Sequence, residues 1–476
     1  MNIQEIFKGV EYDVKNVVEK DNFNNMSYNS REIKEGDIFV ALIGNVVDGH
    51  DYIKSAIDNG AKMIIAERED FDYPNNITLV LVKNLRDNLG QIASNFYNWP
   101  QKNLKIIGVT GTNGKTTSTY ILESIFKNSA RVGTTGYRIL DKEYEAKNTT
   151  PESLDLIKLM KEALDKGVTH FIMEVSSHAL CQGRVKMLEF DSAIFTNLTQ
   201  DHLDFHETLE KYFEAKASIL NHMKKDARLI INKDDKYCRR LLNVSDSFSL
   251  KENANIKGEV LEYTLKGMKV KITKDEKEYI FVTKLMGEYN LQNLLGAILS
   301  AYNLGIDLDE IISDVQKISS IAGRFEIIDN EKDVMVVVDY AHTADGLINI
   351  LKTLSVMKKN RLVTLFGAGG DRDKTKRPKM ANAACMYSDY VYLTSDNPRT
   401  EDPELILNDV EKGMVEGIPY TRICDRENAI KNAIQNLQKN DILLIAGKGH
   451  EDYQIIGREK IHFDDREMAR KYLGGR

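Results

Sequence analysis

Cysteine and proline are scarce in this chain of 476 residues, which contains four cysteines and seven prolines. The cysteines lie far apart with no C-x-x-C pair, so they fit reduced thiols and neither a disulfide framework nor a zinc site. No apolar run approaches the roughly 20 residues of a membrane helix. The opening MNIQEIFKGV lacks the profile of a signal peptide. We therefore expect a cytoplasmic protein with no membrane insertion.

An excess of positive charge is also lacking. The chain has 65 basic and 72 acidic residues, a formal net charge of -7. This balance argues against nonspecific binding of nucleic acid or of anionic membranes. We expect small-molecule substrates, no nucleic acid and no obligatory protein partner. Hydrophobic residues make up 42% and charged residues 29%, which is typical of a globular protein of several domains at this length.

Short β-rich apolar runs alternate with longer segments of helical period along the whole chain. This alternation predicts βαβ units around largely parallel sheets, hence an α/β fold. Because the runs are almost wholly apolar, we expect the strands to be covered on both faces. The expected strands are residues 39–43, 62–66, 77–82, 105–109, 171–174, 193–195, 334–338, 362–366, 390–393 and 442–446.

Turn signals suggest where the domains meet, since the chain has no internal repeat and no low-complexity linker. Residues 98–103 (NWPQKN) precede the strand that leads into a glycine-rich loop, and residues 321–324 (IAGR) precede a new strand run. We predict three domains, at residues 1–100, 101–322 and 323–476.

Residues 105–117 (KIIGVTGTNGKTT) combine a strand, a loop with three glycines and a helical start expected over 118–127. Glycines let backbone N–H groups turn toward phosphate oxygens, and the helix N-terminus adds its positive dipole end. Lys115 would reach the β- and γ-phosphates, and the Thr116 hydroxyl would bind Mg²⁺. A standard P-loop has glycine where this chain has Val109. A tight turn with an incidental lysine is the alternative, and nucleotide binding is favoured.

Polar side chains follow two later strand runs. Glu174 stands at the carboxyl end of one run, the edge where open α/β sheets bind ligands. It is a candidate Mg²⁺ ligand, or else a solvated loop glutamate. His202 follows the next run with Asp201 beside it, and taken alone such a histidine is more often structural.

Lys216 falls on the apolar stripe of a helix expected over 210–223, three or four positions from Phe213, Ile219 and Leu220. An ammonium group on such a stripe needs a partner or a modification. The alternative is a lysine whose charged end reaches solvent at the stripe's edge.

The loop T-G-T-N-G-K-T-T resembles that of the Mur ligase superfamily, which also contains folylpolyglutamate synthases, and the chain as a whole is most similar to its MurE-type branch. The resemblance implies that Lys216 carries a carbamate derived from carbon dioxide. It implies metal ligation by Thr116, Glu174, His202 and carbamylated Lys216, and catalytic roles for Lys115, Lys216, His202 and Glu174. The implied ATP-binding residues are Gly111, Thr112, Asn113, Gly114, Lys115, Thr116, Thr117, Asn290 and Arg324.

Further motifs of that branch imply where a UDP-sugar peptide binds. Ser30 would contact the uracil-ribose end, although a helix-capping serine is the simpler interpretation. The loop N-T-T-P and nearby residues match the muramoyl-dipeptide site, and Arg184 supplies a fixed cation for carboxylate or pyrophosphate. The implied set is Ser30, Asn148, Thr149, Thr150, Ser176, Gln182 and Arg184. The implied architecture is a central P-loop-type ATPase domain with a mostly parallel sheet, between an N-terminal UDP-binding α/β domain and a C-terminal Rossmann-like domain.

The motif D-N-P-R at 396–399 resembles that of enzymes that add meso-diaminopimelate, whereas lysine-adding relatives lack the arginine. Arg399 suits the second carboxylate of a diamino diacid, and it would repel the bare ammonium of lysine. Glu451 suits an ammonium group. The implied amino-acid site is Arg372, Asp396, Asn397, Pro398, Arg399, Gly447 and Glu451.

Together with these residues, the resemblance implies an ATP-dependent ligase that adds meso-diaminopimelate, or a close analogue such as lanthionine, to the D-glutamyl carboxylate of UDP-N-acetylmuramoyl-L-Ala-D-Glu in peptidoglycan precursor synthesis. ATP and Mg²⁺ are the expected co-substrate and cofactor. The alternatives are a lysine-adding homologue, a folylpolyglutamate-synthase-like ligase, or a P-loop ATPase that is not a ligase.

Overall fold

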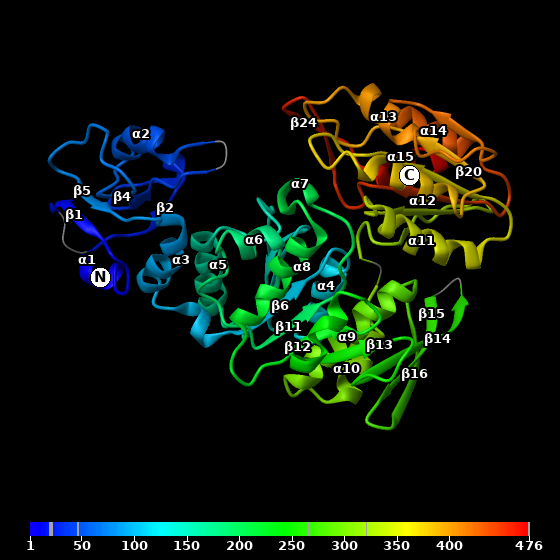
Figure 1. The fold of residues 1–476 in the computed structure, drawn as a ribbon, viewed down its shortest axis with the longest axis horizontal. Coiled ribbons are helices and arrows are strands. Elements are labelled where there is room, and N and C mark those ends of the chain that lie inside the picture. Colours follow the sequence, from blue (N-terminus) through cyan, green and yellow to red (C-terminus); the bar gives the residue numbers. More distant parts are fainter. Residues whose placement is uncertain (19–21, 45–46, 265–266, 320, 475–476) are drawn as a thin grey trace. The chain divides into compact units, whose positions relative to one another are not determined.

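The computed structural model describes residues 1–18, 22–44, 47–264, 267–319 and 321–474. The chain divides into two compact units. The first comprises Met1–Gly108, Phe126–Ala193 and Ala215–Ala227, and the second comprises Val109–Ile125, Ile194–Glu214 and Arg228–Arg476. In the described part of the chain, the strands form sheets of five, eleven and six strands and one two-stranded hairpin (Figure 1). None of the described helices has both the length and the apolar character that a membrane span requires.

The five-stranded sheet belongs to the amino-terminal region and has the order β1-β5-β4-β3-β2. Pairing is parallel from β2 to β5, and β1 is antiparallel to β5. Its strands are β1 (Asp13–Asn16), β2 (Met26–Ser27), β3 (Ile38–Val40), β4 (Met63–Ala66) and β5 (Thr78–Leu81), with helices α1 (Ile3–Ile6), α2 (Ile53–Asp58) and α3 (Leu85–Phe96). Every residue of β3 and β4 is buried, as expected for strands covered on both faces.

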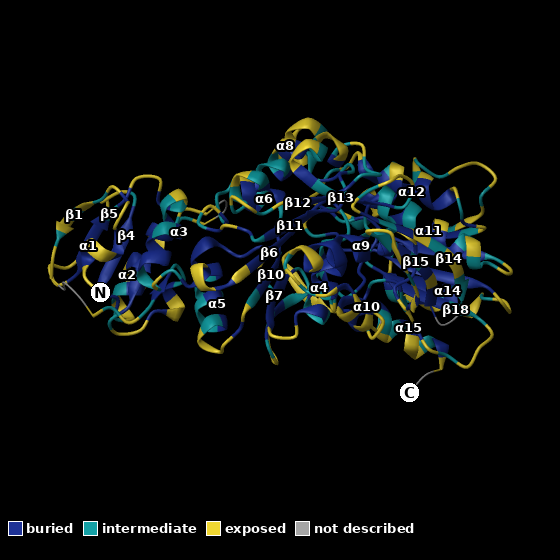
Figure 2. Ribbon diagram, turned by 90° about the horizontal axis from the view of Figure 1, so that it is seen from below, coloured by how far each residue is buried: buried dark blue, intermediate teal, exposed yellow. Residues whose placement is uncertain are grey.

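The largest sheet has the order β16-β15-β14-β13-β12-β11-β6-β10-β7-β8-β9. Its first strands in the sequence are β6 (Lys105–Thr110), β7 (Ser129–Gly133), β8 (Gly136–Ile139), β9 (Lys142–Tyr144), β10 (His170–Glu174) and β11 (Ser192–Phe195). The later ones are β12 (Leu229–Asn232), β13 (Ser245–Ser249), β14 (Ile256–Thr264), β15 (Gly267–Lys274) and β16 (Lys277–Thr283). The strands β6, β10, β11 and β12 are buried along almost their whole length (Figure 2).

The helices of this central region are α4 (Lys115–Ile125), α5 (Ser153–Asp165), α6 (Ser177–Cys181), α7 (Leu203–His206), α8 (Leu209–Ala217), α9 (Glu288–Asn303) and α10 (Leu308–Val315). Helix α9 has the longest run of buried positions among them, from Asn293 to Ala301. It packs against α4, the helix that follows the glycine-rich loop. The glycine-rich loop therefore leads into a helix that is held in place by its packing against α9.

The six-stranded sheet has the order β17-β18-β22-β19-β20-β21, parallel except for β17. Its strands are β17 (Glu326–Ile327), β18 (Met335–Asp339), β19 (Leu362–Phe366), β20 (Tyr390–Leu393), β21 (Tyr420–Arg422) and β22 (Ile442–Ala446); β23 (Tyr453–Ile456) and β24 (Glu459–His462) form the hairpin. The helices are α11 (Ala344–Met357), α12 (Lys376–Cys385), α13 (Pro403–Glu411), α14 (Arg426–Gln435) and α15 (Asp465–Leu473). Short 3-10 helices are η1 (Ser30–Glu32), η2 (Gly49–Tyr52), η3 (Pro100–Asn103), η4 (Ser218–His222) and η5 (Cys238–Val244).

The α/β prediction is confirmed, and each of the ten predicted strands is present within a few residues of its expected bounds. The antiparallel strands β14, β15 and β16 were not predicted. Their residues alternate between buried and exposed, and Ile280 and Val282 of β16 are exposed. Strands β14 and β15 mix polar with apolar residues and so lack the continuous apolar run that marks the parallel strands, whereas β16 has such a run (Y-I-F-V) but buries only part of it.

Candidate active site

The glycine-rich loop, residues 111–114, connects β6 to α4 in the second unit. Gly111 and Gly114 have φ of 141° and 87°, in the region that favours glycine. A Cβ on Gly111 would lie 1.9 Å from Thr196 Oγ1, and a Cβ on Gly114 would lie 2.2 Å from Asn293 Oδ1. Helix α4 begins at Lys115, three residues earlier than predicted. Both glycines are therefore required by backbone conformation and by close packing.

The lysine that follows the loop turns back over it. Lys115 Nζ donates hydrogen bonds to the carbonyl oxygens of Gly111 and Thr112, each at 2.9 Å. The next side chain, Thr116, is buried, and its hydroxyl accepts a hydrogen bond from Arg324 Nη2 at 3.0 Å. The Arg324 guanidinium also stacks on the ring of Tyr340, 4.5 Å from its centroid. Lys115, Thr116 and Arg324, which the sequence assigned to nucleotide binding, thus meet at the loop.

Of two asparagines in α9, one contacts this loop and the other bonds within its own segment. Asn290 is buried and donates to the carbonyl of Met286 at 2.8 Å, within its own segment. Asn293 donates to Asn290 Oδ1 at 3.2 Å and is the side chain that touches Gly114. Sequence reasoning assigned Asn290 to the nucleotide site and missed Asn293, which stands three residues later on the same helix.

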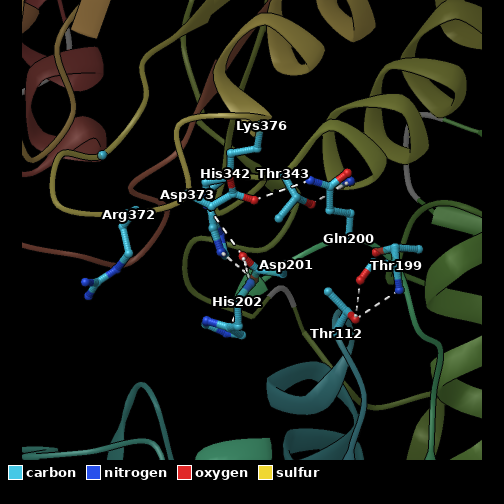
Figure 3. A network of polar contacts seen from close by, with 12 residues as sticks. Thr112, Thr199, Gln200, Asp201, His202, His342, Thr343, Arg372, Asp373 and Lys376 are labelled. Atoms are coloured by element: carbon cyan, nitrogen blue, oxygen red, sulfur yellow. Dashed lines mark hydrogen bonds and ion pairs between the residues drawn. The ribbon is translucent and has the colours of Figure 1, made fainter. Parts of the chain in front are cut away.

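A buried carboxylate, Asp201, lies close to nitrogen atoms of side chains from three segments of the second unit (Figure 3). Its oxygens lie 3.5 Å from His202 Nε2, 3.8 Å from His342 Nε2 and 3.6 Å from Lys376 Nζ. Burial alone would raise the pKa of Asp201, but a hydrogen bond from His342 and the charges of Lys376 and His202 hold it well below its usual range. Asp201 therefore stays ionised and holds the His202 loop to the residues that follow β18 and begin α12.

The loop that contains Asp201 makes further contacts nearby. Gln200 Nε2 donates to Asp373 Oδ2 at 3.3 Å and to Thr375 Oγ1 at 3.1 Å. Thr112, in the phosphate loop, donates to the carbonyl of Thr199 at 3.2 Å. The predicted ligand His202 has left-handed backbone (φ 53°) and a side chain that is 40% exposed, so it reaches solvent beside a fixed carboxylate.

Glu174, in the first unit, ends β10 and is fully buried. Its Oε1 accepts a hydrogen bond from the backbone N–H of Thr134 at 3.0 Å, and its Oε2 accepts one from the Thr134 hydroxyl at 3.1 Å. A Cβ on Gly133 would lie 2.3 Å from Oε1. The solvated-loop alternative for Glu174 is therefore wrong, because the carboxylate is packed and hydrogen-bonded.

The Lys216 side chain is only 1% exposed, as its place on the apolar stripe predicts. The predicted helix over 210–223 is not one regular helix, because α8 ends at Ala217 and the chain tightens into η4. Burial raises the pKa of the Cys181 thiol and the charge of Lys216 opposes this, so the two side chains are neighbours. A lysine reaching solvent at the stripe's edge is excluded by the burial.

Most residues assigned to the muramoyl-dipeptide meet in one network of the first unit. The Thr150 hydroxyl donates to the carbonyl of Glu174 at 2.8 Å and accepts from the Ser176 N–H at 3.0 Å. Arg184 donates to the carbonyl of Thr150 at 2.8 Å and to Gln182 Oε1 at 2.7 Å.

Three other assigned residues lie around or apart from this network. Thr149 bonds the Thr134 hydroxyl at 3.1 Å, and Asn148 is exposed. Ser30 is buried at the start of η1, whose N-cap is Asn29, so the helix-capping interpretation of Ser30 is wrong.

The D-N-P-R motif follows β20 at the carboxyl edge of the six-stranded sheet, and Gly447 follows β22 at the same edge. Asn397 Nδ2 donates to Glu451 Oε2 at 2.9 Å. Arg399 has left-handed backbone (φ 52°), and its Nη1 donates to the carbonyl of Gly370 at 2.7 Å. A Cβ on Gly447 would lie 2.6 Å from Asp396 Oδ2. This edge thus brings the predicted amino-acid residues together.

Arg372 is the exception in this group. It is exposed, points away from the Asp201 network (Figure 3), and donates to the carbonyl of Asp371 at 2.9 Å. Asp371 in turn accepts hydrogen bonds from the backbone and hydroxyl of Thr400. The Arg372 loop is therefore tied to the residue after Arg399.

Comparison with known proteins identifies the family of the chain. The model of the Mur ligase family, catalytic domain matches residues 22–97, that of the Mur ligase middle domain matches 109–301, and that of the Mur ligase, glutamate ligase domain matches 323–449. The UDP-N-acetylmuramoyl-L-alanyl-D-glutamate--2,6-diaminopimelate ligase of Fusobacterium nucleatum is 49% identical over 479 residues, which cover 98% of both chains. The chain belongs to the Mur ligase family.

Further relatives extend the comparison. The ligase of the same name from Clostridium botulinum is 42% identical over 99% of both chains. A solved UDP-N-acetylmuramoyl-L-alanyl-D-glutamate--2,6-diaminopimelate ligase is 34% identical, with a TM-score of 0.67, and the match covers 100% of this chain and 99% of that one. The MurF ligase from Thermotoga maritima in complex with ADP shares the fold at 23% identity and a TM-score of 0.72, over 94% of this chain and 98% of that one.

Mur ligases are ATP-dependent enzymes that form amide bonds, and the family match confirms the predicted three-domain architecture and enzyme class. The boundaries at residues 100 and 322 stay predictions, as do the roles of single residues. Among the described residues, no three His, Cys, Asp or Glu side chains form a metal cluster.

Proposed function

We propose that this Mur ligase joins meso-diaminopimelate, or a close diamino diacid, to the D-glutamyl carboxylate of UDP-N-acetylmuramoyl-L-Ala-D-Glu with consumption of ATP. The observation that carries the proposal is that Arg399 and Glu451 both act on Tyr453, while Glu451 also accepts a hydrogen bond from Asn397 of the D-N-P-R motif. Full-length similarity to ligases named for 2,6-diaminopimelate supports it. Arg399 argues against a lysine-adding homologue, because lysine has no second carboxylate for it to bind. The first domain argues against a folate-type ligase, because it resembles a domain that binds a UDP-sugar.

The distal end of a diamino diacid carries a carboxylate and an ammonium group, and the pocket offers one group for each. Among the described residues, the Arg399 guanidinium has one acceptor, the Gly370 carbonyl, so its Nη2 and Nε remain for a carboxylate. Glu451 supplies the opposite charge. Burial and the Glu451 charge raise the pKa of Tyr453 to about 12, while Arg399 opposes them. Arg399 and Glu451 therefore both act on the Tyr453 ring, so the two groups lie near each other. This is what a pocket for the distal carboxylate and ammonium of a single amino acid requires.

The phosphate loop and its neighbours would carry the first step. The substrate carboxylate attacks the γ-phosphate of ATP, and an acyl phosphate and ADP result. Lys115 and Arg324 supply the positive charge that stabilises this transfer. The deprotonated amine then attacks the acyl carbon, and phosphate leaves as the amide forms. No enzyme nucleophile is needed.

Thr116, Glu174, His202 and a carbamate on Lys216 are the residues that would hold Mg²⁺. Bound there, the ion neutralises phosphate charge. The carbamate is supported by the burial of Lys216, since carbamylation replaces a buried cation with an anionic oxygen donor.

The test is ADP release with UDP-N-acetylmuramoyl-L-Ala-D-Glu and a panel of amino acids. We expect meso-diaminopimelate to give the highest kcat/KM and L-lysine to be poorer by about a hundredfold or more, the cost of an unmatched buried charge. Arg399→Ala should lose most of this preference. The matched control is Arg422→Ala, which removes an arginine that pairs with Glu404 and Glu411 instead.

Better use of lysine by the unmodified chain would refute the amino-acid assignment. ATP turnover that needs neither amino acid nor UDP-sugar would refute the ligase itself and favour an ATPase.

A further inference from the structure

Lys448 lies between two residues of the amino-acid pocket in sequence, and its side chain is fully buried. An ammonium group without water needs charged or strongly polar partners. Lys448 Nζ donates to Asn397 Oδ1 and to Glu451 Oε2, each at 3.2 Å. A lysine has thus been placed inside a pocket where carboxylates of both protein and substrate are expected.

The first consequence concerns the orientation of the Asn397 amide. Its Oδ1 accepts hydrogen bonds from Lys448 Nζ and from the backbone N–H of Ile455, at 2.9 Å. Because both groups are donors only, they require the oxygen on their side, and Nδ2 must then face Glu451. Lys448 therefore helps to fix which end of the amide Glu451 meets.

The second consequence concerns the two oxygens of Glu451. Asn397 Nδ2 and Lys448 Nζ both donate to Oε2. In the part of the chain that the structure describes, Oε1 of Glu451 accepts no hydrogen bond. The carboxylate is thus held by one oxygen while the other stays available, which is the arrangement that an incoming ammonium group needs.

We propose that Lys448 is a specificity-determining positioning residue, which holds the Asn397 amide and Glu451 Oε2 so that Glu451 Oε1 receives the distal ammonium of the diamino diacid. This inference rests on the proposed function, and it deepens it by assigning a residue that acts through two others.

The charges around Glu451 support this role. Burial raises the pKa of Glu451 and the charge of Asp396 adds to that rise, whereas Lys448 and the Asn397 hydrogen bond oppose it. Lys448 also helps to keep Asp396 ionised against burial. The titratable or charged groups that act on Glu451 are Asp396, Lys448, Arg426, Tyr340 and Tyr453.

These charges predict a pH dependence. As pH falls, Glu451 gains a proton and loses its attraction for ammonium. Without Lys448 this loss should begin at a higher pH.

The kinetic test compares Lys448→Met, which keeps the aliphatic length, with Lys448→Gln and Lys448→Arg. In the Met and Gln variants we expect KM for meso-diaminopimelate to rise by about tenfold or more, the effect of one lost charge-assisted hydrogen bond. We expect kcat and KM for ATP to change less than about threefold. Arg should recover part of the loss. The control is Lys439→Gln, which removes an exposed lysine paired with Asp333. A KM for meso-diaminopimelate within about twofold of the unmodified value in both the Met and Gln variants would overturn the inference.

A second measurement does not depend on ligase activity. The ¹³C-carboxyl resonance of Glu451, assigned with Glu451→Gln in glutamate-labelled protein, is titrated in the unmodified chain and in Lys448→Met. We expect the midpoint to rise by about one pH unit in the variant. An unmoved midpoint would refute the role of Lys448 even if diaminopimelate-dependent ADP release stands. A raised midpoint would support it even if the assay gave another amino acid, in which case only the proposed substrate fails.

Discussion

Lys216 shows how much chemistry one residue can imply from its position alone. The position of this lysine on the apolar stripe of a helix predicted a buried side chain whose ammonium group needs a partner or a modification, and the side chain is 1% exposed. Glu174 is comparable, since its place at the end of a strand run predicted a ligand-binding edge and its carboxylate is held by Thr134. Both side chains are buried.

Replacing Lys216 with alanine should reduce ADP release by about a hundredfold or more, the usual cost of removing a group that stabilises transition-state charge. If a carbamate is the working group, a small carboxylate such as formate should restore part of the activity, because it can occupy the same place. The control is Lys211→Ala, an exposed lysine of the same helix. Full activity of Lys216→Ala would contradict the role.

At the scale of the elements, the loop between β6 and α4 depends on close packing as much as on glycine's flexibility. Gly111 lies against Thr196, a residue 85 positions later that follows β11. The unusual position of the glycines in this loop therefore reflects a second strand end packed against it, which no local pattern reveals.

We expect Gly111→Ala to lower ADP release by about a hundredfold, because a methyl group would both strain the backbone and strike the Thr196 hydroxyl. Titration with a fluorescent ATP analogue should show weaker binding. Gly305→Ala is the matched control, since Gly305 has φ of 94° but nothing within 4 Å of its Cβ position. Equal effects of the two substitutions would show that backbone strain alone is responsible.

At the scale of the whole molecule, Asp201 connects regions that are far apart in sequence. It contacts His202, which follows β11, and it also contacts His342 and Lys376 of the C-terminal region. All four residues belong to the second unit (Figure 3). Joining an acyl group to an amine requires both to be aligned, so a fixed connection between these regions should matter for rate.

Asp201→Asn keeps the shape of the side chain and removes its charge. We expect kcat/KM for the amino acid to fall by about tenfold or more, because His342 and Lys376 lose their shared carboxylate. Steady-state ADP release measures this effect. Asp333→Asn, at an exposed aspartate of the same region, is the control. An unchanged kcat/KM would show that Asp201 has no part in alignment.

The sequence by itself determined the strands that are apolar throughout, because burial on both faces leaves a continuous hydrophobic run. It likewise determined the glycine-rich loop between a strand and a helix and the burial of Lys216, since a glycine spacing and a helical period are local patterns. It also indicated Arg399, through a motif of four residues.

Only the tertiary structure decided which polar side chains meet. The contacts of Asn293 with Gly114, of Asp201 with His342 and Lys376, and of Lys448 with Asn397 join distant segments. The alternating strands β14 to β16 and the tightening of α8 into η4 also came from the structure. The physical reason is the same in each case: a hydrogen bond or an ion pair depends on distance in space, and sequence spacing reports that distance only within one helix or strand.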